Sequence, residues 1–399
     1  MEKINFSKIY DFLFALLVFI LPFSYGITNI CLAVLTILFF IKFKKQTIIQ
    51  HYEFPFAILS AIVFYLIFQA VFNFTFIQDS SLYSRFGYLV IMPFLVLKVK
   101  NRQLIKLVAI LSINSTIIFS LFKIAKFYSK FHFLPLSDGW ATNAVLLLER
   151  PYAGIFSLIC IVLSLEQLIL KTRFRLIYLA SLLLSIFFIF LISIRISILS
   201  LIAITAIYGV FYLKVSIKKK ILSFSIGTLL FLSFIMLNPN IAKRFFVEES
   251  INKSITQFKE LEPRVIIWDC AYQVTQQKDF SVLFGTTSYT NMKESMLSCY
   301  DDSIQDYSRK QWFLFRKYNT HNQYLDFYLI GGVLSLILLF LFLYFYIVKN
   351  RSNFFAIAII SSFFIMMSVE NIFHRQFGCL IFAIFVALIA ETKKKQCQN

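Results

Sequence analysis

Five uncharged apolar runs, each of about 18 residues or more, constrain this sequence more than any other feature. A helix rises about 1.5 Å per residue, so each run is long enough to cross most or all of the hydrocarbon core of a bilayer. The runs cover residues 176–194, 196–213, 221–237, 327–348 and 352–369. A water-soluble fold could not bury them together with the rest of a chain that is 59% hydrophobic and only 15% charged. We therefore expect an all-α polytopic membrane protein.

Further apolar segments raise the expected number of spans to about twelve. Residues 12–41 are too long for one span and contain a turn signal at 22–29, so they predict a hairpin of two helices. The segment 377–390 is long enough to close the set only if its helix begins at Ile372. The other expected spans cover residues 54–73, 82–97, 107–122 and 152–170.

Basic residues divide the connections between these spans into two sets. Every second connection carries several Lys or Arg, whereas the short connections around Gly26, Asp79 and Asn371 carry few. Connections rich in Lys and Arg usually face the cytoplasm, which places both termini there. The basic residues behind the net charge of +19 therefore orient the chain in the membrane. No basic stripe with interleaved aromatic residues lies in a polar segment, so we expect no nucleic-acid partner.

The chain divides into three parts by hydropathy. Residues 1–237 hold spans one to nine, residues 238–322 form a long polar loop on the outer side, and residues 323–399 hold spans ten to twelve and a cytoplasmic tail. The loop is nearly charge-balanced, which favours a small folded cap.

The loop contains one helix signal and two cysteines. Pro263 precedes apolar residues at helical spacing, which predicts an amphipathic helix near the membrane surface. Cys270 and Cys299 also lie in the loop. An oxidising compartment would permit a disulfide between them, and two unpaired thiols are the alternative.

Two positions combine polar chemistry with a place at a membrane boundary. Arg195 lies between two apolar runs, where a charge is costly; it is either a structural ion pair or snorkelling side chain, or an anion clamp. His321 and Asn322 lie where the long loop re-enters the membrane. An imidazole there is either a polar interface residue or a general base. The sequence has no Cys-x-x-Cys spacing and no glycine-rich phosphate loop, so we expect neither a metal nor another cofactor.

Taken together, these features resemble the O-antigen ligase and O-antigen polymerase superfamily of bacterial inner membranes. Its members have about twelve spans, an arginine at the start of the span after a long apolar helix, a large periplasmic loop late in the chain, and a His-Asn pair before a glycine-containing helix. The matching features here are Arg195, the loop at 238–322, Arg264 with Trp268, Gly285, and His321-Asn322 ahead of Gly331-Gly332.

The resemblance implies a glycosyltransferase with a C-type glycosyltransferase-like fold. It implies transfer of a glycan from undecaprenyl pyrophosphate to the lipid A core sugar at the periplasmic face, with inversion and without a metal. His321 would act as general base, since an unperturbed imidazole titrates near 6.5, with Asn322 in support. Arg195, Arg264 and Arg150 would bind the pyrophosphate.

Other functions fit parts of this pattern. A polymerase of the same superfamily would join repeat units on the lipid carrier, and a protein-directed oligosaccharyltransferase would use a protein acceptor. A flippase or other transporter of lipid-linked glycans would also have about twelve spans and buried arginines. A transporter predicts two halves related by an internal repeat, and we find no such repeat in this sequence. The single long outer loop favours an enzyme.

Overall fold

The computed structural model describes residues 6–41, 53–134, 139–216, 218–220 and 262–390. Within these residues the regular structure is helical, apart from one isolated β-bridge between Ser281 and Gly285. The helices in chain order are α1 (Phe6–Ile20), α2 (Tyr25–Ile41), α4 (Phe54–Phe72), α5 (Phe76–Leu97), α6 (Arg102–Phe131), α7 (Gly139–Val145), α8 (Arg150–Ile169), α9 (Arg175–Leu191), α10 (Arg195–Ile207), the π-helix η1 (Tyr208–Tyr212), α14 (Pro263–Thr275), α15 (Tyr289–Ser303), α16 (Tyr307–Arg316), α17 (Gln323–Asn350), α18 (Phe354–Met367), the 3₁₀ helix η2 (Ile372–His374) and α19 (Gln376–Ile389).

The helices confirm a membrane protein of the all-α class. In the described residues, six helices are long and apolar enough to cross a bilayer, and four shorter apolar helices accompany them. The predicted hairpin at residues 12–41 is formed by α1 and α2, joined by a turn at residues 21–24. The predicted ninth span at 221–237 and residues 238–261 of the polar loop lie outside the described residues. The count of twelve spans therefore stays a prediction.

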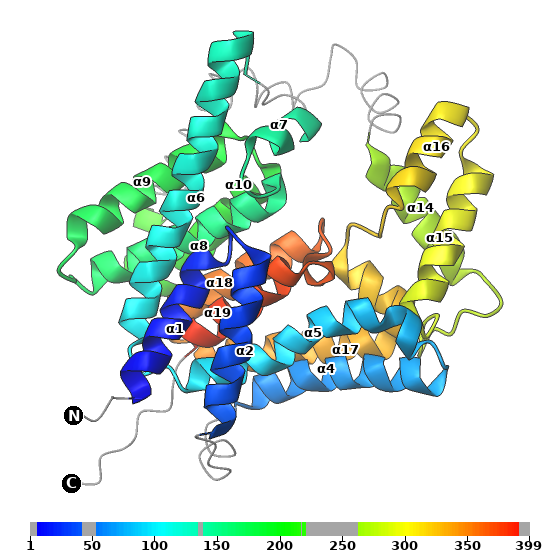
Figure 1. Ribbon diagram of the computed structural model, residues 1–399, viewed down its shortest axis with the longest axis horizontal. Helices are drawn as coiled ribbons and strands as arrows, with labels where there is room; N and C mark the ends of the chain where they lie inside the picture. The colour runs from blue at the N-terminus through cyan, green and yellow to red at the C-terminus, as the bar shows by residue number, and fades with distance from the viewer. Residues whose placement is uncertain (1–5, 42–52, 135–138, 217, 221–261, 391–399) are drawn as a thin grey trace.

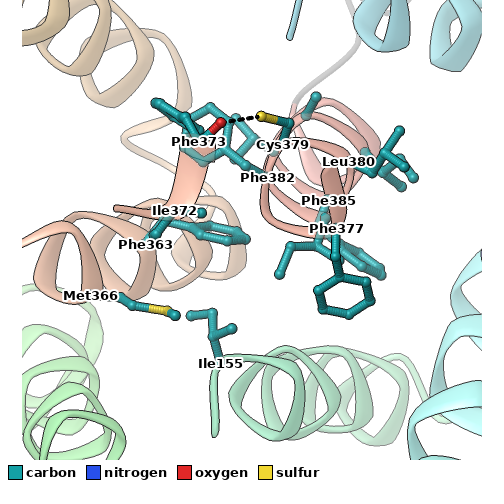
Figure 2. Packing of buried hydrophobic residues seen from close by; sticks show 14 of the residues in the cluster. Ile155, Phe363, Met366, Ile372, Phe373, Phe377, Cys379, Leu380, Phe382 and Phe385 are labelled. Atoms are coloured by element: carbon teal, nitrogen blue, oxygen red, sulfur yellow. Dashed lines mark hydrogen bonds between the residues drawn. The ribbon is translucent and has the colours of Figure 1, made fainter. Parts of the chain in front are cut away.

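Helix α19 lies in the middle of the bundle. It packs on α5 and α18, and Figure 1 shows it in red among the surrounding helices. Every residue from Phe377 to Ile389 is buried, as expected for a helix that is apolar on all sides. In Figure 2, Phe382 of this helix packs beside Phe363 of α18 and Phe373 of η2, with ring centroids 5.1 and 5.0 Å away. Protein therefore covers α19 on all sides.

The helix of the last predicted span is shorter than the sequence analysis expected for a membrane crossing. Residues Ile372–His374 form the separate turn η2, and Arg375 is extended, with φ −115° and ψ 134°. The helix that was expected to begin at Ile372 therefore begins at Gln376 and has 14 residues, a rise of about 21 Å. Polar residues that precede this helix lie inside the bundle, where they contribute to the site described below.

The described end of the polar loop, residues 262–322, folds into a cap of three helices. Figure 1 shows these helices to one side of the bundle, α14 in yellow-green and α15 and α16 in yellow. The predicted amphipathic helix is α14, and its apolar face packs on α15 and α17. A disulfide between Cys270 and Cys299 joins α14 to α15, with the two Cα atoms 5.6 Å apart. The buried residues of the α14 face are Ile267, Cys270, Ala271 and Val274.

A carboxylate from the bundle caps the first turn of α15. Asp79, in the first turn of α5, is fully buried. It accepts hydrogen bonds from the backbone N–H groups of Tyr289 and Thr290 and from the hydroxyls of Ser288 and Thr290, at 2.7–3.0 Å. The free N–H groups at a helix start favour a negative charge, so this contact fixes the cap to α5.

The cap is also joined to α17 through backbone. Helix α17 is interrupted at Gly332, where φ is 66° and ψ is −166°. An interruption of a membrane helix frees N–H and C=O groups, which need partners inside the protein. The loop between α14 and α15 supplies them. The bonds run from Thr286 N to Leu329 O (2.7 Å), from Thr287 N to Ile330 O (3.0 Å) and from Val333 N to Val282 O (2.9 Å).

Candidate active site

The end of the cap and the connection between α18 and α19 meet at one place. Helix α14 bridges them: the indole of Trp268 donates to the carbonyl of Thr320 at 3.0 Å, and Nη2 of Arg264 donates to the carbonyl of Val369 at 3.3 Å. Arg264 and Trp268 are four residues apart and so share a helix face. These contacts place the predicted residue His321 beside Glu370.

His321 faces a carboxylate. Its Nδ1 atom is buried, has no hydrogen-bond partner among the described residues, and lies 3.6 Å from Oε2 of Glu370. The side chain as a whole is 27% exposed, and that of Glu370 is 11% exposed. The backbone of His321 is left-handed, with φ 45°, a strained conformation that recurs at functional sites. The ring therefore has one nitrogen directed to an acid and another edge toward solvent.

Asn322 has a structural role in this arrangement. It is the N-cap of α17, and its side-chain oxygen accepts hydrogen bonds from the backbone N–H groups of Tyr324 and Leu325 at 3.0 and 3.1 Å. An N-cap of this kind stabilises a helix start by about 1 kcal/mol. The predicted support of His321 by Asn322 is therefore indirect, through the position of the chain.

Two of the predicted arginines lie in the same region. Arg264 forms an ion pair with Glu262 at 3.2 Å, and its Nε atom is buried without a hydrogen-bond partner among the described residues. Arg195 is exposed in the first turn of α10 and interacts electrostatically with both Glu262 and Arg264. The guanidinium groups of Arg195 and Arg264 thus both interact with the carboxylate of Glu262. Among the described residues, Nε of Arg264 has no hydrogen-bond partner.

The third predicted arginine, Arg150, caps a helix. Its Nε and Nη2 atoms donate to the carbonyl of Ile192 at 3.0 and 2.6 Å, and Nη2 also lies 3.2 Å from the carbonyl of Ser193. These carbonyls end α9, where a cation is favourable. Arg150 therefore holds the turn that leads to Arg195.

A network of buried polar groups lies next to His321. Nε2 of His374 is 2.6 Å from Oδ2 of Asp326, and the amide of Asn371 donates to Oδ1 of the same carboxylate at 2.9 Å. The hydroxyl of Thr320 contacts both Asp326 (3.4 Å) and Asn371 (3.2 Å). Arg85 of α5 donates to the carbonyl of His374. Because Thr320 precedes His321 directly, this network fixes the segment that carries the imidazole.

Tyr289 packs against this network. Its ring packs edge-on against His374, with centroids 5.1 Å apart. Burial, and then the charge of Asp326, raise the pKa of Tyr289 to about 12, although the charge of Arg85 opposes the shift. The phenol is therefore neutral at physiological pH.

A second ion pair flanks the site at the start of α19. Arg375 lies 2.7 Å from Glu149, with both side chains about half exposed, and its guanidinium lies over the ring of Tyr152. Burial lowers the pKa of Arg375, but the negative charges of Glu149 and Glu370 outweigh it and raise the pKa overall. The carboxylate of Glu370 is therefore balanced by the permanent positive charge of Arg375.

Glu370 is the residue that sequence reasoning did not single out. A signal was present, because Glu370 is the only acidic residue between Asp326 and Glu391, in a segment that is otherwise almost wholly apolar. A carboxylate at such a position is costly unless it has a partner or a function. The partner, His321, lies 49 positions earlier and became evident only from the fold.

Comparison with known proteins identifies one family. Residues 180–340 match the family Wzy_C, described as O-antigen ligase. The matched segment includes Arg195, Arg264 and His321, whereas Arg150 and Glu370 lie outside it. No curated protein matches the chain. Members of the family are membrane enzymes that transfer glycans and use lipid-linked glycans as substrates. Residues 180–340 are thus similar to the O-antigen ligase family, and the resemblance of the chain to the O-antigen ligase and polymerase superfamily is confirmed.

Proposed function

We propose that this protein is a ligase-type glycosyltransferase of the bacterial inner membrane, which moves a glycan from undecaprenyl pyrophosphate to the lipid A core sugar. The observation that carries the proposal is the contact between His321 and Glu370, 3.6 Å apart, beside the guanidinium groups of Arg264 and Arg195. This arrangement combines a base with an anion-binding cluster, the two elements that such a transfer needs.

The base acts on the acceptor. With Nδ1 of His321 directed at Glu370, Nε2 accepts the proton of the acceptor hydroxyl as its oxygen bonds to the anomeric carbon. The carboxylate of Glu370 then stabilises the imidazolium that forms. A contact of 3.6 Å is long for a hydrogen bond, but catalytic contacts commonly shorten once substrate is bound. Direct attack from one face inverts the configuration of the anomeric carbon.

The arginines act on the leaving group. As the bond between the anomeric carbon and the pyrophosphate breaks, negative charge grows on the phosphate oxygens. The unused Nε donor of Arg264 and the charge of Arg195 suit those oxygens. Removal of one such preorganised donor usually costs about 3 kcal/mol, or roughly a hundredfold in rate. In this scheme Arg150 keeps Arg195 in position by holding the turn between α9 and α10.

Two features support a periplasmic location for this chemistry. The disulfide between Cys270 and Cys299 is of a kind that persists in oxidising compartments. The clusters of Lys and Arg that the positive-inside rule places in the cytoplasm lie on the other connections, at 42–45, 98–106, 171–175, 214–220 and 393–395. The donor pyrophosphate would then meet the cap at the outer leaflet.

The test is transfer by the purified protein in nanodiscs, supplied with a glycan on undecaprenyl pyrophosphate and with lipid A core. We expect wild type to label the lipid A core and His321→Asn to lose at least about a hundredfold in rate. Arg264→Ala should lose a similar factor. Asparagine is chosen at position 321 because it tolerates the left-handed backbone found there.

His132→Asn is the matched control, because His132 is also left-handed but is exposed at the end of α6. It should transfer at the wild-type rate. Full activity of His321→Asn would refute the assignment of the base. Lengthened carrier-linked chains in place of labelled lipid A core would identify a polymerase, and movement of the donor without any covalent product would identify a transporter.

A further inference from the structure

Aromatic side chains form a row from the surface of the cap to the imidazole of His321. The ring of Trp312, on α16, lies 5.1 Å from that of Tyr318, and the ring of Tyr318 lies 5.6 Å from that of His321. Trp312 is 41% exposed, whereas Tyr318 is half-buried. The row therefore begins in solvent and ends at the candidate base.

Two buried aromatic residues pack against this row. Phe313 and Tyr300 are fully buried, and the ring of Phe313 contacts both Tyr300 (5.3 Å) and Tyr318 (5.2 Å). The hydroxyl of Tyr300 also donates to the carbonyl of Tyr318 at 3.3 Å. Such contacts hold the exposed rings in place before a ligand arrives, which reduces the entropic cost of binding.

The row and the arginines reach the region of His321 from different elements. Glu370 faces Nδ1 of His321, and Arg264 donates to the carbonyl of Val369, the residue before Glu370. Tyr318 instead belongs to the segment that follows α16. If the donor pyrophosphate occupies the arginine side, the group that meets Tyr318 and Trp312 is the acceptor.

We infer that Trp312 and Tyr318 form a binding subsite for a pyranose ring of the acceptor glycan. The inference rests on the proposed function. One face of a pyranose consists largely of C–H groups, which pack against the electron-rich face of an aromatic ring, while its hydroxyls stay in water. Ligand sites combine such apolar walls with a few polar groups that fix orientation. The sugar held by this subsite presents its hydroxyl to His321.

Two variants test the subsite through kinetics. Trp312→Ala and Tyr318→Ala should each raise the acceptor KM about tenfold, while the donor KM and kcat at saturating acceptor stay within about twofold of wild type. Trp312→Phe keeps a ring and should restore most of the affinity. A merely structural role would instead lower kcat and the thermal stability together.

Phe315→Ala is the matched control. Phe315 also lies on α16 and is 79% exposed, more than Trp312, but it has no ring contact with Tyr318 or His321. Its removal should leave the acceptor KM unchanged. If Phe315→Ala weakened transfer as much as Trp312→Ala, insertion of α16 into the lipid surface would explain the exposed rings, and the subsite would be wrong.

A binding measurement separates this inference from the proposed function. The chain has three tryptophans. In a Trp140→Phe background the emission comes from Trp312 and from Trp268, which lies beside Thr320, so the signal of Trp312 is the difference between this protein and the same protein with Trp312→Phe. The water-soluble core oligosaccharide released from lipid A should quench the emission of the inactive variant His321→Asn. Quenching should be clearly smaller when Trp312→Phe is added, because only Trp268 then reports on the bound oligosaccharide. Wild type without any transfer would refute the proposed function, whereas an active wild type with no quenching and an unchanged acceptor KM in Trp312→Ala would refute the subsite alone.

Discussion

At the scale of single residues, the site depends on a carboxylate beside an imidazole. The side chain of Glu370 is 11% exposed and lies near both His321 and Arg375. Burial of an acid in this position requires positive partners, because a lone charge in a poorly hydrated place costs several kcal/mol. Arg375 supplies a permanent one, and in the proposed mechanism the carboxylate of Glu370 stabilises the imidazolium of His321.

Glu370→Gln tests this role. The amide keeps the shape of the side chain but cannot stabilise the imidazolium, so kcat should fall about tenfold, equal to about 1.4 kcal/mol. The acceptor KM should not change. Steady-state transfer assays measure both quantities, and the exposed Glu294→Gln on α15 is the control. An unchanged kcat in Glu370→Gln would show that the carboxylate takes no part in the reaction.

At the scale of elements, the interruption of α17 decides how the cap is attached. A Cβ atom on Gly332 would lie 2.2 Å from the carbonyl carbon of Leu283, and the left-handed φ of 66° adds strain for any L side chain. Gly285 is similar, because its Cβ would lie 2.5 Å from the carbonyl oxygen of Leu329. Both glycines therefore allow two backbones to approach closely.

Gly332→Ala should destabilise the protein by about 2 kcal/mol, from strain at one backbone position and displacement of the loop. The measurement is thermal unfolding in detergent, where the apparent Tm should fall and transfer should weaken with it. Gly87→Ala in α5 is the control, since a Cβ at Gly87 would meet no atom within 4 Å. Equal Tm values for the two variants would contradict the close approach of the two backbones.

At the scale of the whole molecule, orientation in the membrane can be tested by cysteine accessibility. Gln305→Cys places a thiol on the exposed surface of the cap, and Ser216→Cys places one after η1, on the predicted cytoplasmic side. In a Cys397→Ser background, a membrane-impermeant maleimide applied to intact spheroplasts should label position 305 and spare position 216. The reverse pattern would place the cap in the cytoplasm and overturn the proposed chemistry.

Much of the bundle follows from the sequence, because span length and the positions of turns are local properties. The α1–α2 hairpin, the long helices and the start of α14 at Pro263 are of this kind. The interruption at Gly332 was not predicted, since a Gly-Gly pair is compatible with a continuous helix and the loop that pairs with it lies 43–51 positions earlier in the sequence. The late start of the last helix depended likewise on burial of residues 372–374 within the bundle.

For the site, the sequence identified groups with suitable chemistry but not their partners. Arg195, Arg264 and His321 were distinguished by charge at a membrane boundary, and the fold places Arg264 beside the connection that carries Glu370. Asn322 and Arg150 carry hydrogen-bonding groups that sequence alone cannot assign to a ligand or to a helix end. The structure shows that both satisfy helix ends. Ring contacts such as that of Trp312 with Tyr318 depend on the turn after α16, where Lys317 is left-handed.

The backbone bonds between the cap and α17 also limit how the protein moves. Lifting the cap away would leave amide and carbonyl groups of a membrane helix unpaired where water is scarce, at a cost of several kcal/mol for each group. The cap and α17 must therefore behave as a single rigid body during turnover. In the proposed transfer, we therefore expect the lipid substrates to exchange by lateral diffusion past the described part of the cap, which is fixed on α17.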